Sequence, residues 1–76
     1  MIIEVTYQTT AVAAKKYSQL RRTEFFESTT LPETPAIVKE LTRMGKDFAE
    51  STVLVSEHRM DDAYTLKRKG FRITPL

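Results

Sequence analysis

Short runs of basic side chains beside aromatic ones are the clearest chemical signal in this sequence. Residues 67–69 are all cationic and are followed by Phe71 and Arg72, and residues 15–17 repeat the combination of cations with an aromatic ring. Several cations on one face can bind phosphates, and exposed aromatic rings can stack on bases. We therefore expect a partner or nucleic acid to bind at Lys15, Lys16, Arg21, Arg22, Lys67, Arg68, Lys69 and Arg72.

His58 is the only histidine, so a nucleophilic relay would have to pass through it. Ser56 lies two residues away, on the same face of an expected strand, but nothing in the spacing resembles a nucleophile turn. His58 with Asp61 and Asp62 is more typical of a hairpin end than of a metal site. The chain has no cysteine, and its two glycines are too far apart to form a phosphate-binding loop. We expect no enzymatic activity, no metal and no cofactor.

The length of 76 residues predicts one compact domain that spans residues 1–76. At this size roughly 60% of the unfolded surface can be buried, so stability must come from packing alone or from packing plus a partner subunit. No apolar run approaches the roughly 20 residues that a membrane span requires, and no leader pattern is present. We expect a cytoplasmic protein with no membrane partner.

The net charge of +2 conceals an uneven distribution of charged residues. Every acidic residue except Glu4 lies between residues 24 and 62, whereas both ends of the chain are basic. If the two ends lie together in the fold, their cations share one region, and the small net charge hides an electrically polar molecule.

The residues from Thr34 to Gly45 predict the main helix, over about residues 35–44. Thr34 can cap the helix, Pro35 suits its first position, and Gly45 suits the left-handed residue that follows a helix end. Apolar residues recur at helical spacing, at Ile37, Val38, Leu41 and Met44. Such a helix needs an apolar surface to cover.

Alternating apolar and polar residues predict the sheet beneath this helix. The expected strands span residues 3–7, 53–60, 64–67 and 71–74. The strand that begins at Val53 is expected to be central, because its apolar residues are consecutive. Gly70 suits a hairpin turn with positive φ, and Pro75 ends the last strand because it has no N–H. Phe48 and Phe71 are expected in the core.

Two interpretations of residues 10–23 remain open. In the first, Thr10 caps a helix over about residues 11–22, whose composition favours helix. In the second, residues 9–14 form a connection, and residues 17–28 form a strand that carries Phe25 and Phe26. We favour the strand, because it gives the single helix a larger sheet to cover.

These patterns predict an α+β fold: a small, mostly antiparallel sheet of about four or five strands, with one main helix on one face. They favour a non-enzymatic module that binds a larger protein or nucleoprotein complex, with edge strands that could also pair with a second copy. Small cysteine-free proteins of this kind are common among phage and mobile-element inhibitors of host nucleic-acid-processing proteins. The alternative is a small nucleic-acid-binding protein that uses the basic segments at both chain ends.

Overall fold

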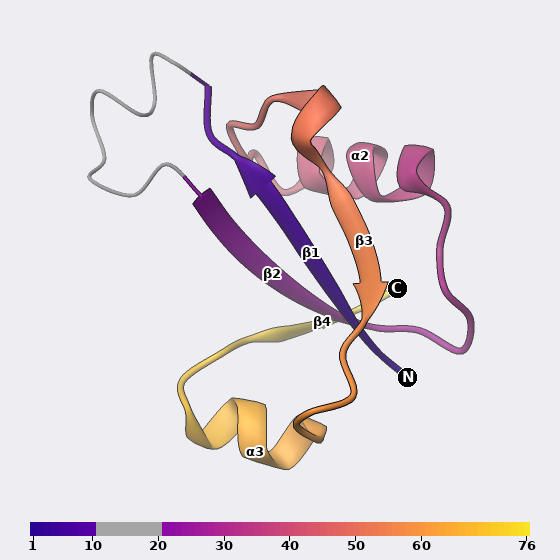
Figure 1. The fold of residues 1–76 in the computed structure, drawn as a ribbon, viewed down its shortest axis with the longest axis vertical. Helices are drawn as coiled ribbons and strands as arrows, with labels where there is room; N and C mark the ends of the chain where they lie inside the picture. Colours follow the sequence, from indigo (N-terminus) through magenta and orange to yellow (C-terminus); the bar gives the residue numbers. More distant parts are fainter. Residues whose placement is uncertain (11–20) are drawn as a thin grey trace.

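One mixed sheet of four strands, in the order β3-β1-β2-β4, organises the computed structural model (Figure 1). The structure describes residues 1–10 and 21–76. In chain order the elements are β1 Ile2–Gln8, β2 Arg21–Glu27, α2 Thr34–Arg43, the short 3₁₀ helix η1 Glu50–Thr52, β3 Leu54–Glu57, α3 Ala63–Arg68 and β4 Ile73–Pro75. β1 is antiparallel to both β2 and β3, while β4 is parallel to β2. The prediction of an α+β fold with a mostly antiparallel sheet is confirmed.

The larger part of the core lies between the sheet and α2. Ile3, Val5 and Tyr7 of β1 are fully buried, and they belong to one cluster with Ile37 and Leu41 of α2. They occupy every second position of β1, which places them on one face of the sheet, as the alternation in the sequence predicts. Each such side chain stabilises the fold by roughly 1.5–3 kcal/mol relative to an exposed position.

The ends of α2 differ slightly from those expected. Glu33 occupies the N-cap position without a side-chain hydrogen bond, so Thr34 is the first helical residue and not the cap. Gly45 has φ of +74° just beyond the last turn, which is the left-handed conformation predicted there. Phe48 is half-buried, and its ring meets the Tyr7 ring edge-on with centroids 6.1 Å apart, which confirms its contribution to the core.

A second, smaller core cluster lies on the opposite face of the sheet. Ile2, Phe25 and Leu66 are buried there, and Ala63 and Ile73 pack against them. Leu66 and Ala63 belong to α3, so this short helix covers one end of the face that α2 leaves open (Figure 1). The sheet is therefore covered by a helix on each face, although unequally.

The predicted strand over residues 64–67 is wrong, because these residues belong to α3. The Asp62 carboxylate accepts a hydrogen bond from the Thr65 N–H at 2.7 Å and caps the helix. Helical spacing then directs Leu66 onto the sheet, where it is almost fully buried. Gly70 does adopt positive φ, at +94°, but it follows the end of α3 and does not form a hairpin turn.

The strand that begins near Val53 is an edge strand and not a central one. β3 ends at Glu57, three residues before the predicted end, and it pairs with β1 alone among the described strands. Leu54 is 59% exposed, because neither helix covers that position. Three apolar residues in a row therefore did not indicate burial on both sides.

The structure supports the strand interpretation from residue 21 onward. Arg21–Glu27 is β2, so the last two residues of the alternative helix over residues 11–22 are extended. Phe25 and Phe26 are both buried, on opposite faces of the sheet. The remainder of the alternative helix, and the start of the predicted strand over residues 17–28, lie outside the described residues.

Candidate functional site

The first half of β2 is an open edge of the sheet. β4 joins β2 only from Phe25 onward, through the pair Phe25 and Ile73. Within the described residues, the segment 21–24 therefore has a neighbouring strand on one side only, which is β1. We call this segment, together with Phe71 and Arg72, the basic edge.

Two residues of the basic edge direct their backbone groups away from the sheet. In β1, the Ile2 carbonyl accepts from the His58 N–H at 2.8 Å, and Gln8 also forms its backbone hydrogen bonds on the β3 side. Because backbone direction alternates along a strand, the odd residues of β1 bond to β2, where their partners have even numbers. Arg21 and Thr23 consequently present N–H and C=O groups outward.

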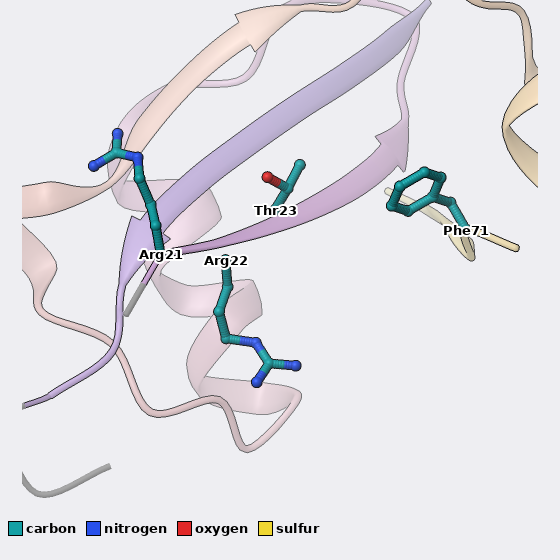
Figure 2. A pocket seen from close by; sticks show the side chains of 4 residues that line it. All are labelled: Arg21, Arg22, Thr23 and Phe71. Atoms are coloured by element: carbon teal, nitrogen blue, oxygen red, sulfur yellow. The ribbon is translucent and has the colours of Figure 1, made fainter. Parts of the chain in front are cut away.

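The side chains of the basic edge surround a hollow of about 240 Å³. Arg21, Arg22 and Thr23 line it from β2, and Phe71 lines it from the segment that leads into β4. Figure 2 shows Arg21 and Arg22 pointing to opposite faces of the sheet, with the Phe71 ring further along β2. Residues that are far apart in the chain therefore meet at this edge, although the cations that line the hollow, Arg21 and Arg22, both belong to β2.

Phe71 contributes an exposed ring to this hollow, and its predicted place in the core is wrong. The side chain is 44% exposed. Its ring meets Phe25 edge-on with centroids 5.1 Å apart, and Phe25 is itself buried beneath α3. One side of the Phe71 ring is thus fixed by packing while the remainder is available for contact.

The arginines of the basic edge lack carboxylate partners within the described residues. Arg21, Arg22 and Arg72 form no ion pair there, and the Arg21 guanidinium donates only to the Thr6 hydroxyl at 3.4 Å. In contrast, three cations of the acidic middle segment are paired: Arg43 with Glu40, Lys46 with Glu24, and Arg59 with Glu57. An anionic partner can therefore bind these arginines without displacing an internal carboxylate.

Glu24 is the one acidic residue of the segment 21–24, and its charge is already offset. Its carboxylate accepts from the Tyr7 hydroxyl at 3.0 Å and lies 3.5 Å from the Lys46 ammonium. Burial, followed by the negative charge of Glu24, raises the pKa of Tyr7 well above its ordinary value, so the phenol stays protonated and keeps donating. Glu24 consequently opposes an anionic partner less than an unpaired carboxylate would.

The other predicted cations lie on or beside α3. Lys69 forms an ion pair with Asp61 at 3.0 Å, so its charge is already paired within the protein. Arg68 lies over the Tyr64 ring, 5.8 Å from its centroid, and both side chains are exposed. Lys67 is exposed and forms no ion pair with any described residue. The last two predicted residues, Lys15 and Lys16, lie outside the described residues.

His58 joins three elements and does not face a nucleophile. Its Nδ1 lies 3.0 Å from a Glu4 oxygen of β1, and its Nε2 lies 3.0 Å from an Asp61 oxygen before α3. The hydrogen bonds from His58 and then from Lys69 hold the pKa of Asp61 below its ordinary value of 3.8. With both ring nitrogens engaged by carboxylates, none remains to activate a hydroxyl.

Neither a metal cluster nor a membrane span is found in the described part of the chain. Residues 1–10 and 21–76 contain no group of three histidine or acidic residues placed to hold a metal ion. None of the helices there is long and apolar enough to cross a membrane.

Comparison with protein-family models, with curated proteins and with solved structures finds no match. The site must therefore be interpreted from its own geometry.

Proposed function

We propose that this protein is a non-enzymatic binding module that attaches to an acidic surface of a larger protein through its basic edge. One observation carries the proposal: Arg21 and Arg22 line one hollow with the exposed Phe71, and neither they nor Arg72, which follows Phe71 in the chain, have carboxylate partners among the described residues. Protein interfaces favour such a combination, in which an aromatic ring supplies apolar contact area and arginines bind carboxylates.

The rest of the described structure supports a binding role over a catalytic one. The basic edge offers guanidinium groups and an aromatic ring, and its only acidic group, Glu24, is engaged by Tyr7 and Lys46. Such a set can recognise charge and shape, and the one carboxylate that could act as a base is already held by these two partners. We place the module in the cytoplasm, as an inhibitor or modulator of a nucleic-acid-processing protein or complex of a phage or mobile-element host.

Affinity capture with charge-reversed variants tests this proposal. Wild-type protein is immobilised and exposed to lysate of the organism that produces it, and bound proteins are identified by mass spectrometry after nuclease treatment. The double variant Arg21→Glu and Arg72→Glu should lose the specific partner, because reversed charges repel an acidic surface. The matched control, Lys39→Glu and Arg59→Glu, makes the same change in net charge away from the basic edge and should retain it. Equal capture by both double variants would refute the proposal.

Direct binding of single-stranded nucleic acid is the second candidate function. The observation that favours it is Phe71, whose exposed ring lines the same hollow as Arg21 and Arg22, because aromatic rings beside cations can stack on bases. Acidic residues of β3 and α2 do not enter the hollow, so they oppose phosphates less than the sequence suggests.

Fluorescence anisotropy separates this candidate from the first one. Labelled 20-nucleotide DNA and RNA strands are titrated at low and at physiological salt. If nucleic acid is the partner, binding weakens with salt by roughly 0.7 log units per neutralised phosphate for each log unit of salt concentration. Phe71→Ala should weaken binding by removing the stacking ring, whereas Tyr64→Ala tests the other exposed ring. Absence of binding at low salt removes this candidate.

A further inference from the structure

We infer that the basic edge binds its partner by strand addition: an extended acidic segment of the partner protein pairs with the open half of β2, in line with β4. This inference rests on the proposed function and specifies the form of the partner. Partner strands that add to an exposed sheet edge obtain affinity from backbone hydrogen bonds and specificity from side-chain contacts.

The backbone of β2 provides the first part of the argument. Arg21 and Thr23 direct their N–H and C=O groups away from β1, toward the side on which β4 lies further along. β4 uses this side only from Phe25 onward. The segment 21–24 can therefore pair with an extended segment of about four residues, roughly 13 Å long.

Within residues 1–10 and 21–76, the path of the chain leaves this position accessible. The residues before Ile73 come from α3, which covers the end of the sheet near Phe25. Figure 1 shows the connection from α3 meeting β2 at an angle, instead of running beside its first half. The hollow lined by Arg21, Arg22, Thr23 and Phe71 occupies the space between them. A partner strand would fill this hollow and end against the Phe71 ring.

The side chains that flank the open backbone determine the charge of the partner strand. Arg21 and Arg22 point to opposite faces of the sheet (Figure 2), and neither has a carboxylate partner among the described residues. In a strand paired with β2, successive side chains also point to alternate faces. Acidic residues on both faces of the partner strand would therefore meet an arginine, and an apolar residue at its end would contact Phe71.

Proline at position 23 tests the inference, because the Thr23 N–H points away from β1. Thr23→Pro removes this outward donor and blocks the neighbouring position, and edge strands tolerate proline at such sites. Thr23→Val is the matched control, since it keeps the backbone donor and favours strand. Decapeptides are selected from a displayed random library on the wild-type protein, and the affinity of the best one is measured by fluorescence anisotropy for all three proteins.

We expect the selected peptides to be acidic, and we expect their affinity to fall at least tenfold for Thr23→Pro and to stay within twofold for Thr23→Val. A peptide with N-methylated backbone amides should bind the wild-type protein at least tenfold more weakly. This second measurement keeps the test decisive if Thr23→Pro does not fold. Non-acidic peptides, or full binding by the proline variant and the methylated peptide, would overturn the inference.

The same variants separate this inference from the proposed function. If Thr23→Pro still captures the protein partner from lysate while Arg21→Glu with Arg72→Glu does not, the basic edge is the interface but strand addition is wrong. If sedimentation shows a dimer of the wild-type protein that Thr23→Pro abolishes, the occupant is a second copy of this chain and the inference of a partner strand fails.

Discussion

Replacing Leu66 by alanine tests whether α3 covers the second face of the sheet. Leu66 is 1% exposed and belongs to one cluster with Ile2 and Phe25. Buried Leu→Ala changes cost about 2–5 kcal/mol, with the larger values where a cavity remains. The cluster contains only three buried residues, so its walls can relax, and we expect a loss of about 2.5–3 kcal/mol.

Such a loss is a large fraction of the total stability of a small domain, which begins near 5 kcal/mol. Urea unfolding followed by far-ultraviolet circular dichroism should show a lower midpoint with an unchanged slope. In a thermal scan, 1 kcal/mol corresponds to about 4–8 °C at this size, so the melting temperature should fall by about 10–24 °C.

Tyr64→Ala is the control, because it lies on the same helix but is 69% exposed. It removes the contact with the Arg68 guanidinium, which is worth about 0.5–1 kcal/mol at an exposed site. A loss for Leu66→Ala no larger than that for Tyr64→Ala would refute the assignment of α3 to the core. Hydrogen exchange that leaves β4 unprotected in the wild-type protein would point to the same error.

Three further substitutions test local features of the fold. Asp62→Ala should make the α3 amides exchange their hydrogens faster, because it removes the cap of that helix. Tyr7→Phe should cost about 1–2 kcal/mol in urea unfolding, because it keeps the buried ring but removes the hydrogen bond to Glu24, and no measurable change would contradict that bond. Asp61→Asn should destabilise the protein at pH 7 but not at pH 2: the depressed pKa of Asp61 means that its contribution is present above pH 3.8 and is lost as pH falls through the folded value. A difference between wild type and Asp61→Asn that persists at pH 2 would show that the contacts of Asp61 with His58 and Lys69 are not electrostatic.

The elements that the sequence predicted correctly are those with strong local signals. In α2, the apolar stripe of Ile37 and Leu41 is long enough to establish helical periodicity, and Gly45 marks its end. In β1, alternation continues over six residues, from Ile3 to Gln8, which is enough to assign the buried face. Both signals depend on residues that are close together in the chain, so no knowledge of the tertiary structure is required.

α3 was predicted wrongly as a strand, because its local signals fit two structures. Over six residues, Tyr64 and Leu66 alternate as in a strand, while the Asp62 cap resembles an ordinary turn residue. The helix is favoured by a distant contact, since it places Leu66 against Ile2 and Phe25. The edge strand β3 poses the same problem: Leu54 stands between two other apolar residues in the sequence, as in a buried strand, but its exposure depends on the tertiary structure, in which neither helix covers it.

The candidate site combines a feature that the sequence shows with one that it does not. Arg21 and Arg22 are recognisable as cations in the sequence. The sequence does not show which residues of the segment 21–24 direct their N–H and C=O groups toward β1 and which direct them outward. The pairing with β1 decides this: the N–H and C=O groups of Arg22 and Glu24 point toward β1, and those of Arg21 and Thr23 point outward. A register shift of one residue would exchange these pairs and would bring the Glu24 carboxylate out of its contact with Tyr7. The backbone groups that this edge presents are therefore a property of the strand register, whereas its positive charge follows from its composition.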